Sequence, residues 1–337
     1  MADRTIAVFG AYGHTGRFVV AELRNRGWTP ILCGRDPEKL AVLGASHPGL
    51  QVRVASIDDP AALDHALAGA AAVINCAGPF LDTAPPLIEA ALRARIHYLD
   101  LAAEQGAVVA TFEQFSGPAR TAGVAVIPAM AFYGGLGDLL ATAAMGDWTE
   151  ADEIRIAIAL DSWLPTRGTR LTGMRNTAKR LVVSDNRLQA LADPPPTRSW
   201  EFPAPFGTLE VIGLPLSEII TMSRHLRSPE IHAYMNLEPL KDLRDPRTPA
   251  PTPTDASGRS SQQFLVDMVV RKGSEQRRAV AHGRDIYAVT APLVVEAAVR
   301  LVTGSCETTG VASAGQGFDA RDFLASLKAE DIVIELD

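Results

Sequence analysis

Short apolar runs alternate with helical patterns of apolar residues along the N-terminal part of the chain. Six runs have the length and composition of buried strands: residues 5–9, 30–34, 51–56, 71–78, 97–102 and 123–129. Five stretches between them have apolar positions at helical spacing: residues 17–27, 36–45, 58–69, 84–96 and 112–122. The prolines of the fourth helix are expected in its first turn. Because strands that are apolar on both sides are covered on both faces, the alternation predicts a parallel α/β sheet.

The pattern changes after about residue 150. Three stretches predict strands, the last two as a hairpin: residues 154–160, 263–273 and 277–284. Residues 168–183 predict one helix rich in Arg and Lys, and residues 245–258, rich in Pro, Thr and Ser, predict a surface loop. Near the end, residues 291–304 predict a strongly apolar helix and residues 318–330 a short amphipathic one.

The length of 337 residues suits two domains. We expect residues 1–138 and 288–337 to form the α/β domain. Residues 139–287 are expected to form the second domain.

The chain is acidic, with 32 Lys and Arg against 39 Asp and Glu and a net charge of −7. Such a chain repels phosphate backbones, so we expect no nucleic-acid partner. Cys33, Cys76 and Cys306 form no CxxC pair, and His and Cys residues show no metal-ligand spacing, so we expect no metal site. The N-terminus lacks a basic segment followed by an apolar one, which predicts a cytoplasmic protein.

One segment has the length of a membrane span. Residues 123–146 carry a single charge, that of Asp138. Their proline and their glycines, Gly134, Gly135 and Gly137, favour a strand, a Gly-rich loop and a buried helix instead. We therefore expect no stable insertion into a membrane.

The sequence GAYGHTG joins the first predicted strand to the first predicted helix. Within a run of strand–helix–strand units, this is the phosphate-binding turn of a Rossmann-type dinucleotide-binding domain, although a Gly-rich turn without a ligand is the alternative. The first glycine permits a tight turn, the second lets backbone amides approach a pyrophosphate, and the third allows close packing of the helix, whose positive end lies here. We expect cofactor contacts from Gly10, Tyr12, Gly13, His14, Thr15 and Gly16.

The end of the second predicted strand indicates which dinucleotide binds. NAD-binding domains usually carry an acid there, which accepts the ribose 2′-hydroxyl and repels a 2′-phosphate. This strand ends with Arg35, whose guanidinium can bind a phosphate through two hydrogen bonds. The sequence therefore favours NADP(H). In the alternative, Arg35 is an ordinary surface residue and Asp36 binds the ribose.

Two further cofactor contacts are expected after strands, because ligands bind at the carboxyl edge of such sheets. Asp58, after the third strand, is placed to flank the adenine. Cys76, Ala77, Gly78 and Pro79, after the fourth, are expected along the nicotinamide ribose. We expect Cys76 to be a packed residue and not a nucleophile, since nothing suggests a base beside it.

Several enzyme classes are excluded by missing motifs. None of the lysines has a tyrosine four residues before it, so the Tyr-x-x-x-Lys pair of short-chain dehydrogenases is absent. The sequence also lacks the G-x-S-x-G nucleophile elbow of hydrolases and the Walker A motif of P-loop proteins, so these two classes are excluded as well.

The sequence resembles the saccharopine dehydrogenase-like oxidoreductases, which include trans-acting enoyl reductase-like proteins. The segments that carry the resemblance are GAYGHTGRFVVAEL, ILCGRDPEKL, VINCAGPF, HYLDLAAE, GVAVIPAMAFYGGLGDLLA, GRDIYAVTAPLVVEAAVRLVTG and GVASAG. They lie in residues 1 to about 145 and again from about residue 282, whereas the middle is only loosely similar.

The resemblance implies a doubly wound Rossmann sheet and a second α+β domain with a mixed sheet. It also implies that the C-terminal helices pack back on the Rossmann domain, and that the middle sheet forms a homodimer interface. The active site would then be a cleft between the domains that holds a small-molecule substrate.

Polar residues near the carboxyl ends of strands are candidates for the chemistry. Tyr133 and Asp138, in the Gly-rich segment, are the best general-acid candidates, although Asp138 is favoured as the cap of the following helix. Asp100 and Glu104 lie at the end of the fifth strand, at the same edge. Tyr98, near the start of that strand, is expected to be structural.

Substrate contacts are expected from three residues. Phe80 ends the fourth strand at the catalytic edge. Arg175 and Lys179 are four residues apart on a predicted helix and could together bind a carboxylate, although a solvated basic face is the commoner explanation.

We therefore expect an NADP(H)-dependent oxidoreductase that transfers a hydride between nicotinamide and a C=N, C=C or C=O carbon. The alternative is a non-catalytic NADP(H)-binding sensor or regulator, because the sequence shows no unmistakable acid–base pair.

Overall fold

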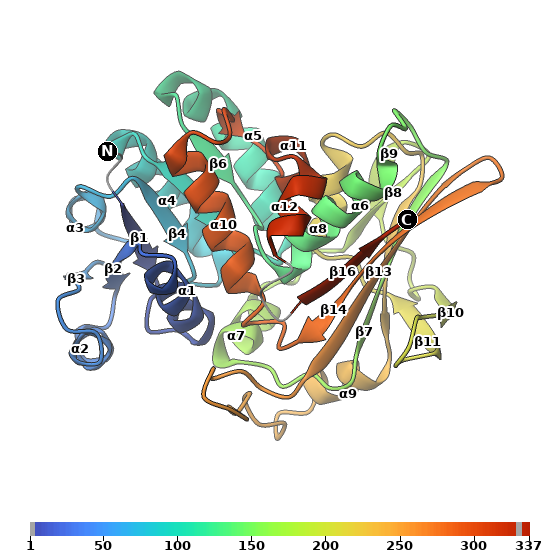
Figure 1. Ribbon diagram of the computed structural model, residues 1–337, viewed down its shortest axis with the longest axis horizontal. Coiled ribbons are helices and arrows are strands. Elements are labelled where there is room, and N and C mark those ends of the chain that lie inside the picture. The colour runs from blue at the N-terminus through green and yellow to red at the C-terminus, as the bar shows by residue number, and fades with distance from the viewer. Residues whose placement is uncertain (1–3, 328–331) are drawn as a thin grey trace. The chain divides into compact units, whose positions relative to one another are not determined.

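The computed structural model describes residues 4–327 and 332–337 and divides into two compact units. Unit 1 contains the chain up to Ala131 together with Thr290–Ser313. Unit 2 contains Phe132–Val289 and Ala314–Asp337 (Figure 1). The chain therefore passes from unit 1 to unit 2, back to unit 1 and again to unit 2. The sequence predicts the first domain over residues 1–138 and 288–337, so the boundaries differ at residues 132–138, 288–289 and 314–337, all of which lie in unit 2.

Unit 1 is built on a parallel sheet of seven strands in the order β15-β6-β5-β4-β1-β2-β3. The strands are β1 (Thr5–Phe9), β2 (Thr29–Gly34), β3 (Val52–Val54), β4 (Ala72–Asn75), β5 (His97–Asp100), β6 (Ala125–Ile127) and β15 (Gly310–Val311). The six strands expected in this region are confirmed, and the short β15 at the edge is additional. The strand order reverses between β1 and β4, and this point of a doubly wound sheet is where dinucleotides bind.

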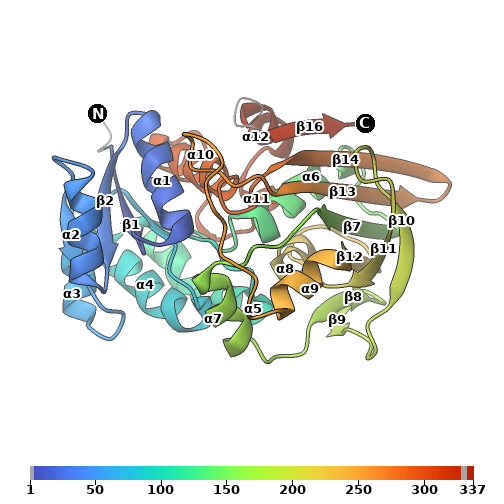
Figure 2. The ribbon, with the colours of Figure 1, turned by 90° about the horizontal axis from the view of Figure 1, so that it is seen from below.

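Helices cover both faces of this sheet, as the apolar strands predict. They are α1 (His14–Asn25), α2 (Pro37–Ala45), α3 (Pro60–Leu67), α4 (Phe80–Ala94), α5 (Gln105–Ala122) and α10 (Thr290–Thr303). Helices α1 and α10 pack together on one face, while α4 packs against α3 and α5 on the other (Figure 2). The core beneath α3 and α4 contains buried residues such as Phe9, Ile31, Leu63, Leu87 and Tyr98.

Helix α4 begins earlier than the sequence predicts. It starts at Phe80, so Pro85 and Pro86 lie inside the helix and not in its first turn. The N–H of Phe80 donates to the Glu104 side chain (2.9 Å), which caps the helix from outside. A local sequence pattern could not supply this cap, because Glu104 lies 24 residues away along the chain.

Unit 2 contains a mixed sheet, which confirms the expected α+β architecture. Its main path is β10-β11-β12-β7-β13-β14-β16, and the β8–β9 hairpin pairs with one end of β12. Among the described strands of this sheet, the β12–β7 pair is parallel and the other pairs are antiparallel. The strands are β7 (Glu153–Leu160), β8 (Leu181–Ser184), β9 (Arg187–Ala190), β10 (Thr197–Glu201), β11 (Thr208–Gly213), β12 (Ile231–Asn236), β13 (Gln263–Lys272), β14 (Glu275–Arg284) and β16 (Ile332–Leu336).

Helices cover one face of the unit 2 sheet. The helices of this unit are α6 (Gly137–Met145), α7 (Arg167–Arg175), α8 (Ser217–Ser223), α9 (Glu238–Arg244), α11 (Ala314–Gly317) and α12 (Ala320–Ser326). Helix α6 packs against β13 and β14, and it also contacts α8, α11 and α12 (Figure 1). Of the C-terminal helices, α10 therefore packs on the Rossmann sheet as expected, whereas α11 and α12 belong to unit 2.

The opposite face of this sheet has its own apolar cluster, which includes Trp200, Tyr234 and Leu265. The fully buried Asp267 lies on this face. It accepts hydrogen bonds from Nε (2.7 Å) and Nη2 (2.6 Å) of Arg278, and from Nε1 of Trp200 (2.8 Å). This carboxylate ties the β10 strand to the β13–β14 hairpin.

The helix predicted over residues 168–183 is wrong in its second half. Helix α7 ends at Arg175, and residues 181–184 form β8. Arg175 and Lys179 are both exposed and do not share a helix face. The helix face on which Arg175 and Lys179 were expected to bind a carboxylate together is therefore absent.

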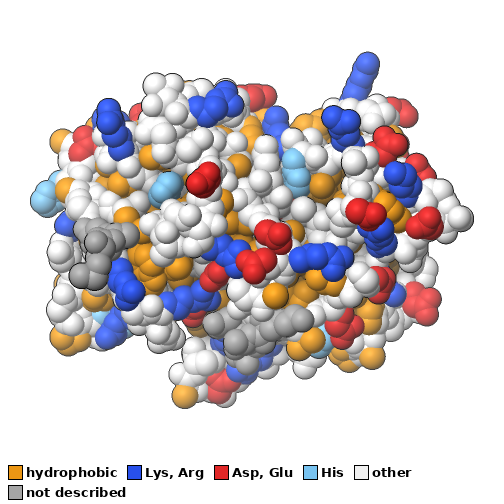
Figure 3. Space-filling view, turned by 45° about the horizontal axis from the view of Figure 1, so that its top comes forward, with side chains coloured by type: hydrophobic (Ala, Val, Ile, Leu, Met, Phe, Trp, Pro, Cys, Tyr) orange, Lys and Arg blue, Asp and Glu red, His pale blue; other side chains and the backbone are white. Residues whose placement is uncertain are grey.

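Residues 123–146, which have the length of a membrane span, contain the expected strand (β6) and the expected buried helix (α6). The Gly-rich segment between them includes an irregular helical turn, Phe132–Leu136, in which Tyr133 and Gly134 have non-helical backbone angles. No helix within residues 4–327 and 332–337 is long and apolar enough to cross a membrane. The helix predicted over residues 318–330 is present as α12, and its predicted residues 328–330 lie outside the described residues. On the face shown in Figure 3, basic and acidic side chains are interspersed.

We expect Asp267→Ala to lower the free energy of unfolding by about 2–4 kcal/mol, because it leaves Arg278 and the Trp200 indole N–H without their acceptor. Urea denaturation measures this change. Asp147→Ala is the matched control, since Asp147 also pairs with an arginine but is 85% exposed. Equal effects of the two substitutions would contradict the structural role of Asp267.

Candidate functional site

The turn between β1 and α1 has the close packing that its glycines predict. The N–H groups of Gly10 and Ala11 donate to Cys33 O (2.8 and 3.2 Å), and Gly13 N donates to Gly10 O (2.9 Å). Gly10 has a φ of +82°, and a Cβ on Gly16 would lie 2.3 Å from Gly10 O. No side chain caps α1, whose N-cap residue is Gly13. The first turn of α1 thus presents backbone N–H groups that suit a pyrophosphate.

The end of β2 carries the residues expected to distinguish the two dinucleotides. Arg35 is exposed and makes no hydrogen bond or ion pair with any residue that the structure describes. Asp36 instead caps α2, accepting from Lys39 N (3.1 Å) and Lys39 Nζ (2.7 Å), and these bonds lower its pKa. Lys39 Nζ also lies 5.7 Å from the centre of the Tyr12 ring. The Asp36 carboxylate is already hydrogen-bonded, whereas the Arg35 guanidinium is bonded to none of the described residues. This arrangement favours binding of a ribose 2′-phosphate over binding of a ribose 2′-hydroxyl.

The other predicted cofactor contacts follow β3 and β4. Asp58 is exposed and accepts from Ser56 Oγ (3.3 Å). Cys76, Ala77, Gly78 and Pro79 are half-buried directly after β4. Burial raises the pKa of the Cys76 thiol, and the charge of Asp100 adds to this. Such a thiol is a poor nucleophile, in agreement with the sequence.

A buried polar network fixes the ends of β4 and β5. Asn75 Nδ2 donates to Thr83 Oγ1 and Tyr98 Oη (both 3.1 Å), and Tyr98 Oη donates to Asp100 Oδ2 (3.0 Å). Asp100 Oδ1 also accepts the N–H groups of Ala102 (3.0 Å) and Ala129 (2.7 Å). Asp100 is therefore a structural residue, although its position at the catalytic edge suggested chemistry.

Glu104 lies beside this network. It is 1% exposed, and its Oε1 is the acceptor for Phe80 N. Burial raises the pKa of the Glu104 carboxyl, the N–H of Phe80 opposes this, and the charge of Asp100 raises it further. Phe80, the predicted substrate contact, is itself buried as the first residue of α4.

Asp138 does not cap α6, so the favoured interpretation of this residue is wrong. It lies inside the first turn, is fully buried, and binds His225 Nε2 through Oδ1 (2.7 Å). Its Oδ2 accepts Gly315 N (2.8 Å). Asp138 thereby joins α6 to the end of α8 and to α11. Sequence reasoning missed His225, which lies 87 residues away and has no motif around it.

Tyr133 belongs to a polar cluster that we call the Tyr133 cluster. It consists of the buried Tyr133, Ser217 and Glu218 and the half-buried Arg180. The Tyr133 ring stacks on Trp163, with 5.7 Å between ring centres. A Cβ on Gly137 would lie 3.3 Å from Glu218 Cβ, so this glycine lets α6 and α8 approach closely.

Three polar atoms of this cluster have no hydrogen-bond partner among the described residues: Tyr133 Oη, Ser217 Oγ and Glu218 Oε2. Burial raises the pKa of Tyr133 well above its usual value, and Tyr287 and Glu218 add to this while Arg180 opposes it. Burial also raises the pKa of Glu218 to about 7. Unpaired buried polar groups cost about 1–3 kcal/mol each, so this cluster is a candidate for ligand contacts.

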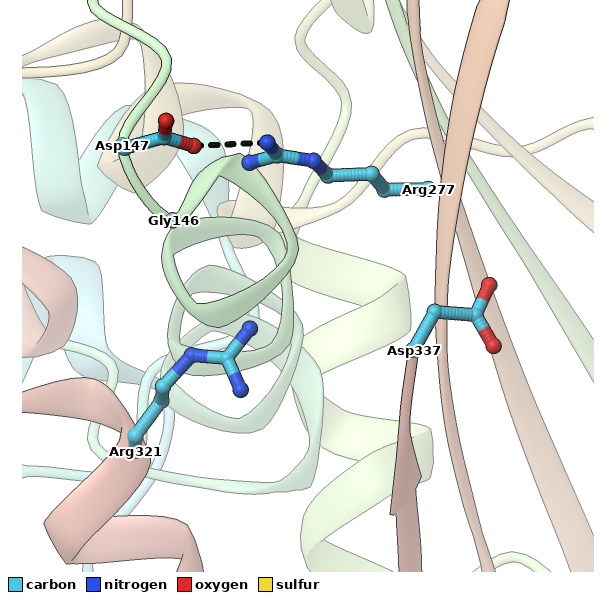
Figure 4. A pocket seen from close by; sticks show the side chains of 5 residues that line it. All are labelled: Gly146, Asp147, Arg277, Arg321 and Asp337. Carbon is cyan, nitrogen blue, oxygen red and sulfur yellow. Dashed lines mark hydrogen bonds and ion pairs between the residues drawn. The ribbon is translucent and has the colours of Figure 1, made fainter.

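A surface cavity of about 620 Å³ in unit 2 is a weaker candidate (Figure 4). Its lining residues are Gly146, Asp147, Arg277, Arg321 and Asp337. Arg277 already binds Met145 O and Asp147 (both 2.6 Å) and stacks on Trp148, and Arg321 donates to Ala143 O (3.0 Å). In the described part of the chain, no group of three or more His, Cys, Asp or Glu side chains is placed to hold a metal ion.

The geometry of unit 1 defines a Rossmann-type dinucleotide-binding domain. Residues 6–127 match the family model described as the saccharopine dehydrogenase NADP binding domain. Unit 1 therefore contains an NADP(H)-binding domain of the saccharopine dehydrogenase type, which confirms the family resemblance and the cofactor.

Curated relatives support the same family. A saccharopine dehydrogenase-like oxidoreductase of Bos taurus is 28% identical over 145 residues, which cover 38% of this chain and 34% of the relative. The protein of the same name from Homo sapiens is 31% identical over 117 residues, covering 29% of this chain and 27% of the relative. The matched part of the chain thus spans about a third of these relatives' length.

A solved structure extends the fold comparison to the whole chain. Apo saccharopine dehydrogenase (L-Glu forming) from Saccharomyces cerevisiae superposes with a TM-score of 0.68 and covers 99% of both chains. The sequence identity is 11%, so this likeness shows the fold alone.

We expect Arg35→Ala to weaken NADPH binding by about 10- to 100-fold, the value of a charge-assisted phosphate contact, and to leave NADH binding unchanged. Fluorescence titration with both dinucleotides measures this. Arg24→Ala, which removes an exposed arginine at the end of α1, is the control. Equal affinity of the unaltered protein for NADPH and NADH would contradict the role of Arg35.

The raised pKa of Glu218 predicts a dependence of stability on pH. From about pH 4.5 to about pH 7 the unfolded chain loses this proton while the folded chain keeps it, so the Glu218 contribution to stability falls by about 3 kcal/mol. Glu218→Gln removes this loss, and its stability relative to the unaltered protein should be higher at pH 8 than at pH 5. Urea denaturation at both pH values measures this. The exposed Glu275→Gln should show no such change, and a pH-independent effect of Glu218→Gln would refute the assignment.

Proposed function

We propose that this protein is an NADP(H)-dependent oxidoreductase that transfers a hydride between nicotinamide and a C=N, C=C or C=O carbon of a small organic substrate. The observation that carries the proposal is the phosphate-binding turn with Arg35 free to bind a 2′-phosphate, in a domain of NADP-binding type. The curated relatives named as oxidoreductases support it. The bound cofactor would supply the hydride, and the chain would hold it through Gly10, Gly13, Gly16 and Arg35.

We assign proton donation to Tyr133. A C=O or C=C carbon that accepts a hydride leaves negative charge on the neighbouring atom, which a proton must neutralise. Tyr133 follows the carboxyl end of β6 by six residues, and its hydroxyl is buried without an acceptor of its own among the described residues. Stacking on Trp163 fixes the ring, so the hydroxyl has a defined direction.

Glu218 and Arg180 would adjust the charge around Tyr133. Both act electrostatically on the Tyr133 hydroxyl, Glu218 opposing its ionisation and Arg180 favouring it. Because Glu218 is protonated below about pH 7, it would add no negative charge beside Tyr133 under these conditions.

Asp138 is proposed as a positioning residue in place of a proton donor. Both of its carboxylate oxygens are bound, one to His225 and one to Gly315 N. It fixes the first turn of α6, directly after the loop that carries Tyr133.

Other parts of the proposal rest on the sequence. Phe80, Arg175 and Lys179 stay predicted substrate contacts. Arg175 and Lys179 are proposed as individual contacts and no longer as a pair. The interdomain position of the substrate and the cytoplasmic location also stay predictions, as does a homodimer through the unit 2 sheet, whose edge strand β16 carries the 50% exposed Val333.

We expect the protein to oxidise NADPH with at least one member of a panel of imine, enoyl and keto compounds. Tyr133→Phe should lower kcat for enoyl or keto substrates by roughly 100-fold or more without changing KM or NADPH affinity, because only the proton donor is lost. The absorbance of NADPH reports the rate.

Tyr234→Phe is the matched control, since Tyr234 is also buried in unit 2 but lies in the cluster on the opposite face of the sheet. Tight NADPH binding without turnover of any compound would favour the non-catalytic sensor. An unchanged kcat in Tyr133→Phe would instead leave the oxidoreductase and refute the assigned donor.

A further inference from the structure

One carboxylate oxygen in unit 1 is buried without a partner. Glu104 is 1% exposed, and its Oε1 accepts the N–H of Phe80 (2.9 Å). Its Oε2 has no hydrogen-bond partner within residues 4–327 and 332–337. Leaving such an oxygen unpaired destabilises the protein, and the effect is larger for a charged group. A donor from a bound molecule would remove this destabilisation.

Short contacts connect Glu104 to the phosphate-binding turn. A Cβ on Gly10 would lie 3.0 Å from both Ala77 N and Ala77 Cβ, so the turn and the loop after β4 are in close contact. That loop is held by Asn75, which accepts Ala77 N (3.0 Å), and by Thr83, which donates to Ala77 O (2.6 Å). Three residues after Ala77, the chain reaches Phe80 and its bond to Glu104. All of these residues belong to unit 1.

The strand order indicates which half of the cofactor would lie on the side of the sheet that carries Glu104. Arg35 directly follows β2, on one side of β1, and marks the adenosine phosphate half of the cofactor. Glu104 follows β5, and the loop that it holds follows β4, both on the other side of β1. A dinucleotide bound across the switch point between β1 and β4 therefore presents its nicotinamide half to Glu104.

We propose that Glu104 is a cofactor-binding residue whose Oε2 accepts a hydrogen bond from the carboxamide NH2 of the nicotinamide ring. A carboxylate is an acceptor, and the carboxamide carries the N–H donor of the nicotinamide ring. Because Oε1 is held by the first N–H of α4, the direction of Oε2 is fixed before the cofactor binds. Glu104 would thus orient the ring. The inference depends on the cofactor assignment and is independent of the reaction and of Tyr133.

The test compares three ligands: NADP+, its 3-acetylpyridine analogue, in which a methyl group replaces the NH2, and 2′-phospho-ADP-ribose, which lacks the ring. Isothermal titration gives the affinities of the unaltered protein, Glu104→Gln and Glu89→Gln. Glu104→Gln keeps an oxygen for Phe80 N, so α4 stays capped. Glu89 is exposed on α4 and serves as the matched control.

We expect the unaltered protein and Glu89→Gln to bind NADP+ about tenfold more tightly than the acetyl analogue, the value of one charge-assisted hydrogen bond. In Glu104→Gln this ratio should fall to about one, because the side-chain NH2 can donate equally to the carbonyl of either ligand. The affinity for 2′-phospho-ADP-ribose should be the same in all three proteins.

Two results would overturn the inference while leaving the cofactor assignment intact. One is a ratio in Glu104→Gln equal to that of the unaltered protein. The other is an equal loss of affinity for NADP+ and 2′-phospho-ADP-ribose, which would make Glu104 a support of the whole site. Failure of the unaltered protein to bind any of the three ligands would overturn the cofactor assignment itself.

Discussion

The close approach of α1 to the end of β1 is the constraint on which the cofactor site depends. The carbonyl oxygen of Gly10 occupies the place where a Cβ of residue 16 would lie. Only a glycine there lets the helix begin directly over the strand, with its uncapped N–H groups at the carboxyl edge of the sheet. Gly10 also touches the loop after β4, so the same contact fixes that loop. The absence of a Cβ at Gly16 thus allows the packing that positions several of the elements that would surround a dinucleotide.

Within the described residues, buried polar groups are hydrogen-bonded to one another in some parts of each unit and left unpaired in others. In unit 1, Asn75, Tyr98 and Asp100 satisfy one another and nearby backbone groups, which makes the ends of β4 and β5 rigid. Glu104 in unit 1 and Tyr133 and Glu218 in unit 2 instead each keep a polar atom unpaired among the residues described. A fully hydrogen-bonded network stabilises a fold. Unpaired buried groups reduce stability and indicate a place where a ligand could supply the missing hydrogen-bond partner.

Much of unit 1 could be predicted from the sequence because its signals are local. Strand, turn and helix follow one another within about 30 residues, and the choice between NADP and NAD depends on Arg35 at a fixed position after β2. The candidate site in unit 2 could not be predicted in this way. Asp138 stands near a helix start, where a cap is expected, and only the fold brings His225 to it. Glu218 lies in the apolar segment LSEIITM and gives no signal as a buried acid.

The alternation of the chain between the two units has a consequence for how the protein is made. Helix α10 and strand β15 complete unit 1 but follow residues 132–289 of unit 2, and β16 completes the sheet of unit 2 last. A ribosome that has released only the first 131 residues has produced a sheet without the helix that packs on α1, β4 and β5. Neither unit is a contiguous segment that could finish folding early. Both would reach completion late in synthesis, so chaperone protection during translation matters more here than for domains arranged end to end.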